Sequence, residues 1–165
     1  MDFRLELKKL KKNNTFYSFG AGNSVLIGQI SRIFDGAIPP SYRIFLEELG
    51  SGNSRSPLDM FDFHGTGAGD VASLVGHNGQ LRENEEKHQI PVKTPKHLLE
   101  VSNMGDDVTW FFDLSQRRSD GECKVIGYIC GLPEDQQPEW VKTDESFDTF
   151  EDFFRSKTGL LDRAS

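Results

Sequence analysis

The segment from Ile38 to Gly50 constrains the fold more than any other part of the chain, because it contains the start, the buried face and the end of one helix. Two consecutive prolines begin it, and proline is tolerated in the first helical turn, where its missing N–H has no partner to lose. Gly50 can adopt the positive φ that commonly ends a helix. Four apolar side chains between them form one helical stripe: Tyr42, Phe45, Leu46 and Leu49. We therefore predict an amphipathic helix that packs on a core and carries no catalytic chemistry.

The length and the cysteine content indicate the class of protein. A chain of 165 residues most simply forms one domain, and it can bury a core without disulfides or metals. Only two cysteines are present, Cys123 and Cys130. No signal-peptide core follows Met1, and no apolar run approaches the length of a transmembrane helix. We predict a single domain over residues 1–165, located in the cytoplasm, with free thiols and no membrane partner.

The charge is acidic and unevenly distributed. The formal net charge of −7 disfavours nucleic acid as a partner and suits a basic protein partner. Residues 1–12 nevertheless carry five basic and two acidic side chains, whereas residues 132–154 carry eight acidic ones and a single base, Lys142. The acidic run has two interpretations, a solvated face and a docking surface.

The periodicity of the remaining chain predicts helices first, then strands, then a final helix. Residues 24–34 read as an amphipathic helix capped by Asn23 or Ser24, and Asp70 can cap another helix with Val71, Leu74 and Val75 on its apolar face. Residues 3–10 fit both a strand and a helix. A last helix over residues 146–155 has Gly159 as its stop.

Four strands are expected, at residues 58–63, 97–102, 108–114 and 123–129, the last two forming an antiparallel hairpin with a long polar loop. Trp110 and Phe112 should share one face of their strand, with Phe111 on the other. Residues 51–57 and 83–89 read as polar, exposed segments. This order favours an α+β fold with a mostly antiparallel sheet and helices packed against it.

Candidate catalytic motifs are weak. The glycine-rich turn at residues 64–69 could hold a nucleotide phosphate, but Asp70 stands where a dinucleotide fingerprint needs its third glycine, and no Gly-Lys-Ser/Thr follows. The four histidines and two cysteines show no metal-ligand spacing. Asp106 and Asp107 read as turn residues. We predict no catalytic, cofactor-binding or metal-binding residue, and we do not expect an enzyme.

Landmarks spread over residues 24–155 resemble the SUKH superfamily, which includes the fungal Smi/Knr cell-wall regulators and many bacterial immunity proteins. The first is the helix with Pro39 or Pro40, Tyr42, Phe45, Leu46 and Gly50. The others follow in the family's order: Pro95, residues 98–101, Gly105-Asp106, residues 110–114, and Ser146-Phe147 with Phe150 and Phe153. Residues 50–53 depart from the family's tighter turn, and residues 83–89 and 116–122 are idiosyncratic loops, where a binding family would encode the choice of partner.

The resemblance implies a SUKH-like α+β domain with its core at roughly residues 24–155. It implies a non-catalytic immunity protein that binds and neutralises a cognate toxin, often a nuclease. The alternative that it leaves open is a regulatory scaffold of the Smi/Knr type, which recognises a signalling partner.

We assign docking of a basic toxin domain to the acidic run. Trp140, beside Pro138, is either an exposed anchor or a contact of a satellite core, whereas Trp110 reads as a core residue. The predicted partner-binding residues are Glu134, Asp135, Glu139, Trp140, Asp144, Glu145, Asp148, Glu151 and Asp152.

Overall fold

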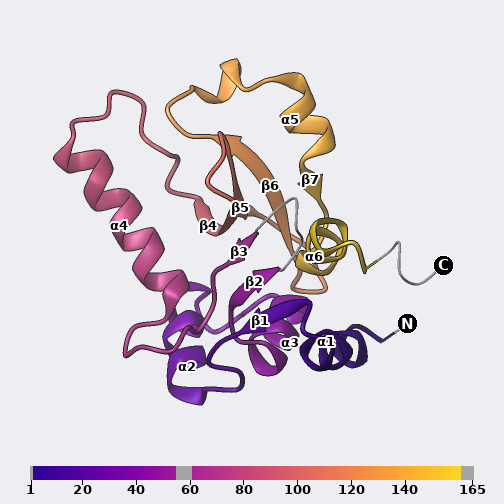
Figure 1. Cartoon of the computed structure of the whole chain (residues 1–165). Helices are drawn as coiled ribbons and strands as arrows, with labels where there is room; N and C mark the ends of the chain where they lie inside the picture. Colours follow the sequence, from indigo (N-terminus) through magenta and orange to yellow (C-terminus); the bar gives the residue numbers. More distant parts are fainter. Residues whose placement is uncertain (1, 55–60, 161–165) are drawn as a thin grey trace.

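The computed structural model describes residues 2–54 and 61–160. Within these residues, strands form one antiparallel sheet in which each strand pairs only with its neighbours in the sequence (Figure 1). In order, the strands are β1 (Phe16–Ser18), β2 (Gly52–Ser54), β3 (Asp62–Phe63), β4 (Leu98–Asn103), β5 (Val108–Arg117), β6 (Cys123–Ile129) and β7 (Ser146–Phe147). The predicted α+β class with an antiparallel sheet is confirmed.

The helices of the described residues divide between the two faces of the sheet. In order, they are α1 (Phe3–Lys12), α2 (Ser24–Ile33), α3 (Pro40–Glu48), α4 (Ser73–Lys87), the 3-10 helix η1 (Glu134–Gln136), α5 (Glu139–Asp144) and α6 (Phe150–Thr158). Side chains of α1, α2, α3 and α6 fill much of one core, to which α4 adds Leu74 and α5 adds Val141. The outer parts of α4 and of the η1–α5 segment stand apart from one another at the other end of the molecule (Figure 1). In the described parts of the chain, no helix has the length and apolar character needed to cross a bilayer.

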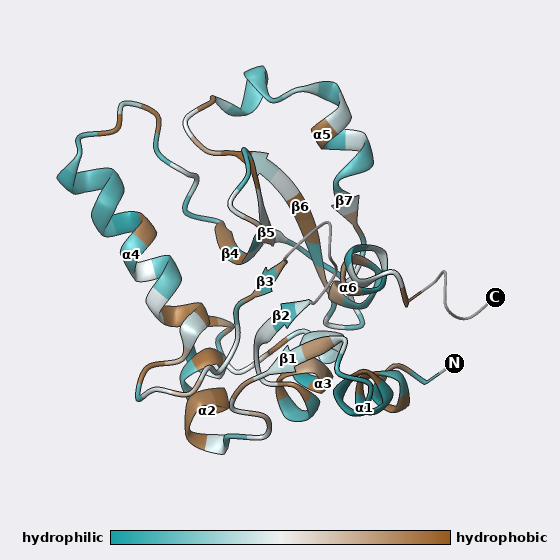
Figure 2. Ribbon diagram, viewed as in Figure 1, coloured by the Kyte–Doolittle hydropathy of each residue, from teal (hydrophilic) through white to brown (hydrophobic). Residues whose placement is uncertain are grey.

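The alternation along β5 separates an inner and an outer face of the sheet, as predicted. Trp110 and Phe112 lie on the inner face in the main core, and Phe111 lies on the outer face with Leu98 and Tyr128. Hydrophobic residues follow β4, much of β6 and α2, while most of α4 is hydrophilic (Figure 2). The outer face thus carries a second, smaller cluster, to which Leu81 of α4 also contributes.

Aromatic side chains fill the main core. The ring of Tyr42 stacks on Phe45, with centroids 5.9 Å apart, and meets Phe112 and Phe150 edge-on at 4.9 Å each. Such edge-to-face pairs stabilise a core beyond the burial of their area. The core extends beyond residues 24–155, because Phe3, Leu7 and Leu10 of α1 and Leu160 after α6 are buried in it. Of the two alternatives for residues 3–10, a strand and a helix, the structure thus shows the helix.

The proline-initiated helix forms as predicted, and its start is capped from outside. Pro39 provides no side-chain cap, but the Glu122 carboxylate accepts hydrogen bonds from the Ser41 N–H (2.7 Å) and the Ser41 hydroxyl (2.8 Å). Gly50 ends the helix with φ +78°, and its carbonyl oxygen would lie 1.9 Å from a Cβ added to Gly65. The glycine-rich turn therefore allows two segments of backbone to approach closely.

Helix α4 differs from the prediction at both ends. It begins at Ser73, and Asp70 provides no cap; the Ala72 N–H donates to the Gln29 side chain instead (2.8 Å). Val71 is 57% exposed and lies outside the apolar face. The helix continues to Lys87, so residues 83–87 are helical, and Glu85 is buried where an exposed segment was expected.

The C-terminal helix also begins later than predicted. Ser146 and Phe147 pair with β6 as strand β7, and Thr149 then caps α6 by accepting a hydrogen bond from the Asp152 N–H (3.1 Å). Gly159 ends the helix with φ +70°, as predicted. Strands β1 and β2 and helix α5 were not predicted, and of the strand expected at residues 58–63, positions 58–60 lie outside the described residues.

Candidate functional site

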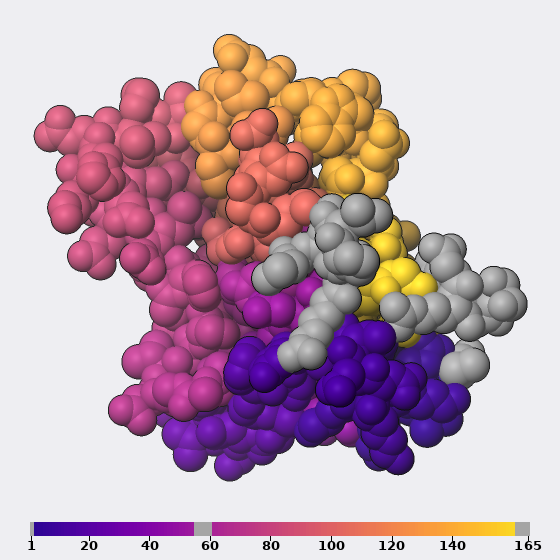
Figure 3. Space-filling model, in the orientation of Figure 1, coloured from indigo at the N-terminus to yellow at the C-terminus, as the bar shows by residue number. Residues whose placement is uncertain are grey.

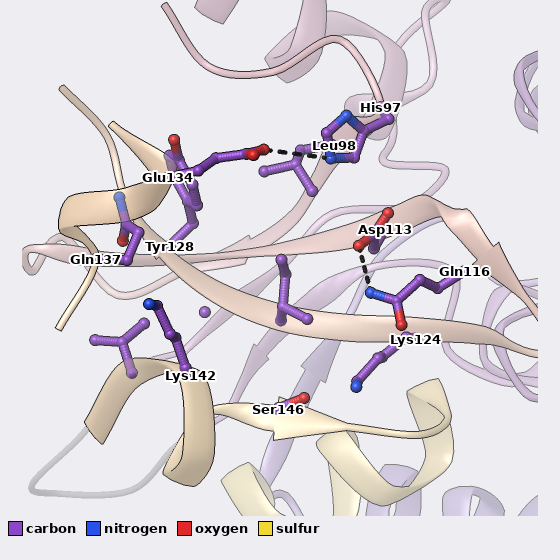
Figure 4. A pocket seen from close by; sticks show the side chains of 13 residues that line it. His97, Leu98, Asp113, Gln116, Lys124, Tyr128, Glu134, Gln137, Lys142 and Ser146 are labelled. Atoms are coloured by element: carbon purple, nitrogen blue, oxygen red, sulfur yellow. Dashed lines mark hydrogen bonds and ion pairs between the residues drawn. The ribbon is translucent and has the colours of Figure 1, made fainter. Parts of the chain in front are cut away.

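A hollow of about 340 Å3 lies on the outer face of the sheet, between the strands and the η1–α5 segment (Figure 4). Leu98, Ile126 and Tyr128 supply apolar surface to it. The register of the strands brings lining residues of three strands together, because Leu98 of β4 pairs with Asp113 of β5, which pairs with Lys124 of β6. The hollow thus lies between the outer face of β4, β5 and β6 and the η1–α5 segment that packs beside it.

The charges around the hollow are of both signs. Asp113 accepts hydrogen bonds from the Ser115 hydroxyl (2.5 Å) and the Gln116 amide (2.8 Å). Burial alone would raise the pKa of Asp113, but these bonds outweigh it and lower that pKa, so the carboxylate is ionised at neutral pH. His97 faces Glu134 across the opening, with Nε2 and Oε1 3.6 Å apart. The hollow therefore suits a polar or charged group of a partner.

Two side-chain amides extend the hydrogen bonding of the sheet at opposite edges. Gln137 accepts from the Ile129 N–H (2.8 Å) and donates to the Ile129 carbonyl oxygen (3.0 Å). Asn78 of α4 likewise accepts from the Glu100 N–H of β4 (2.7 Å) and donates to the Glu100 carbonyl oxygen (2.9 Å). Each amide takes the place of a missing strand residue, because it offers the same donor and acceptor as a peptide group. The η1–α5 segment and α4 are thereby fastened to β6 and β4.

The predicted partner-binding residues do not all lie in the same kind of environment. Most of them are exposed. These are Glu134, Asp135, Glu139, Trp140, Asp144, Asp148 and Asp152. Trp140 is 51% exposed, whereas Trp110 is 3% exposed and belongs to the core, as predicted.

Glu145 and Glu151 instead make contacts within the protein. Glu145 accepts a hydrogen bond from the Trp110 indole N–H (3.0 Å) and pairs with Lys157 (2.6 Å). Glu151 accepts from the Arg155 guanidinium (3.2 Å). In the space-filling view, α4 and the η1–α5 segment form two separate projections at one end of the molecule (Figure 3). The acidic residues of η1 and α5 lie on one of these projections.

A second cluster of side chains that could act as ligands lies beside β3 and was missed by the sequence analysis. Asp62, His64 and His77 each offer a ligand atom, and these atoms lie within 4.8 Å of one another. The rings of His64 and His77 stack with centroids 3.8 Å apart. Partial burial, followed by the neighbouring His64, lowers the pKa of His77. The only sequence signal was the Asp62-x-His64 spacing, which places two side chains on one face of a strand.

Comparison with protein-family models and with curated proteins finds no match for this chain. The resemblance to the SUKH superfamily therefore rests on the residues that suggested it.

Proposed function

We propose that this protein is a non-catalytic immunity protein of the SUKH type, which binds and neutralises a cognate toxin in the cytoplasm of the cell that makes it. The partner is a basic toxin domain, such as a nuclease, and the docking surface is the exposed acidic part of the η1–α5 segment. The observation that carries the proposal is that these acidic side chains are exposed on a segment that Gln137 fastens to the sheet.

The charge of this surface favours a basic partner. Glu134, Asp135, Glu139 and Asp144 are exposed within eleven consecutive residues, in which Lys142 is the only base. Complementary charge raises the association rate and selects against acidic partners. A fixed segment also loses less conformational entropy on binding than a loop that must be ordered first.

Trp140 supplies an apolar anchor within the acidic surface. Tryptophan is enriched among the residues that dominate binding energy at interfaces, and a half-exposed indole in a charged segment has more area to bury against a partner. The neighbouring hollow, with Asp113 and Glu134 opposite Lys124, can receive a polar side chain of the toxin.

The test uses the toxin domain encoded by the gene next to the one for this protein. We expect the two proteins to form a one-to-one complex and the immunity protein to restore growth of cells that express the toxin. Reversing three charges, Glu134→Lys, Asp135→Lys and Glu139→Lys, should slow association and flatten its dependence on salt.

A matched control reverses three exposed acidic residues elsewhere: Glu83→Lys, Glu86→Lys and Asp107→Lys. Both triple variants change the net charge equally, so only the position of the charge differs. Equal effects of the two variants on association would exclude the η1–α5 segment as the docking surface. A basic neighbouring toxin that neither binds nor is neutralised would contradict the immunity function.

A further inference from the structure

Asp62, His64 and His77 converge from two elements that are far apart in the sequence. Asp62 and His64 lie at β3 and project to one side of it, and His77 lies in the second turn of α4. His64 is buried, Asp62 is half-buried and His77 is exposed. The three residues thus form a site with an inner and an outer side.

The buried His64 is held in the orientation that a metal ligand requires. Its Nε2 lies 2.5 Å from a Glu100 carboxylate oxygen. This contact selects the tautomer that carries its proton on Nε2, in which Nδ1 offers its lone pair to a metal ion. That nitrogen lies 3.8 Å from Oδ2 of Asp62. A carboxylate behind a histidine is the usual outer partner of metal-binding histidines, because it fixes the ring and increases its basicity.

The carboxylates are themselves fixed by amides. Asn103 donates to Oε2 of Glu100 (3.3 Å). With its amide oriented so that the nitrogen faces Asp62, Asn53 donates to Oδ1 of Asp62 (2.8 Å), which leaves Oδ2 for another partner. These hydrogen bonds from the two asparagines therefore leave Oδ2 of Asp62 and Nδ1 of His64, which lie 3.8 Å apart, available to one ion.

We propose that Asp62, His64 and His77 bind a divalent transition-metal ion of the zinc class. Two imidazoles and one carboxylate are ligands that zinc accepts, and three protein ligands leave a fourth position open. The cluster borders a hollow of about 290 Å3, also lined by Ser51, Gly67 and Ser73, which gives the open position room for water. This site is independent of the acidic docking surface.

Binding requires a small rearrangement of His77. Zinc lies about 2.0–2.1 Å from its ligands, so the ligand atoms, which now lie within 4.8 Å of one another, must come closer together. The ring of His77 must also leave its stacked position, because stacked rings cannot both direct an in-plane lone pair at one ion. His77 is exposed, so its ring can turn toward solvent at the cost of the stacking contact, whereas His64 is buried.

The experiment titrates the whole chain, freed of metal by a chelator, with zinc chloride in a calorimeter. We expect one ion per chain with micromolar or tighter affinity. Cobalt chloride should produce visible absorption bands from an ion with nitrogen and oxygen ligands. The variants His77→Ala and Asp62→Asn, at positions that are not buried, should remove both signals, and Glu100→Gln should weaken the affinity about 10–100-fold.

Two controls exclude other ligands. His88→Ala removes an exposed histidine at the end of the same helix, eleven residues from His77 and about 16 Å along the axis, and should bind as the parent does. Cys130→Ser removes the exposed thiol and should also bind normally. The proposal is overturned if neither metal binds, if binding survives His77→Ala, or if Cys130→Ser abolishes it.

Discussion

At the scale of single residues, Glu122 joins three parts of the protein. Its carboxylate caps the start of α3 through Ser41, and the Ser41 hydroxyl in turn accepts from the Glu151 N–H of α6 (3.2 Å). A carboxylate at a helix N-terminus also interacts favourably with the helix dipole. Burial raises the pKa of Glu122, and the hydrogen bonds from Ser41 oppose this without cancelling it. Part of the loop that seemed free for partner recognition is therefore committed to the fold.

This raised pKa makes the stability depend on pH. The folded state holds the Glu122 proton more tightly than the unfolded state, so its contribution is complete below the unfolded pKa of about 4.3 and is lost as the pH rises through the folded pKa. We expect the unfolding free energy of the parent, minus that of Glu122→Gln, to fall between pH 4 and 7. Urea denaturation at several pH values measures it. Glu83→Gln, which removes an exposed charge on α4, is the control; a difference that rises with pH for Glu122→Gln would contradict the assignment.

At the scale of elements, two polar side chains of α4, Asn78 and Arg82, attach the helix to the sheet. Strand β3 pairs with β4 at Asn103 and Ser102, and beyond them no strand of residues 2–54 or 61–160 lies beside this edge of β4. Asn78 satisfies both backbone groups of Glu100 there, and Arg82, one turn further along, donates to the Leu98 carbonyl oxygen (2.8 Å). These hydrogen bonds therefore fix the position of α4 along β4.

Asn78→Leu should loosen this alignment. The leucine has a similar shape but leaves the N–H and the carbonyl of Glu100 without their partner, and an unsatisfied buried polar group costs about 1–3 kcal/mol. We expect the free energy of unfolding to fall by about that amount, and amide exchange in α4 to accelerate. Asn84→Leu, at an exposed position of the same helix, should change stability by less than about 0.5 kcal/mol. Equal losses from the two variants would show that the amide contacts do not hold α4.

At the scale of the whole molecule, the first and last helices close the core together. The rings of Phe3 in α1 and Phe154 in α6 meet with centroids 6.0 Å apart, and Arg155 pairs with the buried Glu6. The Arg155 guanidinium also lies over the Phe3 ring, 5.4 Å from its centroid. Helix α1 is thus an integral part of the core, although its lysines remain exposed.

Leu7→Ala tests whether the core unfolds as one unit. Leu7 is completely buried, and truncating such a leucine costs about 2–5 kcal/mol. We expect the midpoints measured by tryptophan fluorescence and by far-ultraviolet circular dichroism to fall together. Leu5→Ala, on the 49% exposed neighbour in the same helix, should have a small effect. Separate midpoints for the two probes would mean that α1 unfolds independently of the sheet.

The elements that could be predicted from the sequence are those specified by their own residues. Helix α3 contains its start, stripe and stop, and the faces of β5 follow from alternation. The short strands β1 and β2 exist because they pair with each other, so nothing local identifies them. The contact of Glu122 with Ser41, 81 residues away, and that of His64 with His77 could not be predicted either, because both depend on the tertiary fold and not on local sequence.

For the candidate site, the sequence predicted exposure better than it predicted contacts. The acidic run is mostly exposed, and Trp110 lies in the core as expected, whereas the structure resolves the open choice for Trp140 in favour of exposure. Glu145 and Glu151 belong to the same run but form internal bonds, because Trp110 and Arg155 approach them from other elements. Charge composition carries no information about such partners.

The order of the strands has a consequence for how the protein can diverge. Because each strand pairs only with its neighbours in the sequence, an insertion between two strands changes one connection and leaves the other pairings in place. Residues 88–97 and 130–138 are such connections, and both end beside the hollow on the outer face. Descendants of this chain can therefore acquire new surfaces at that end by lengthening either connection, while the same core is inherited unchanged.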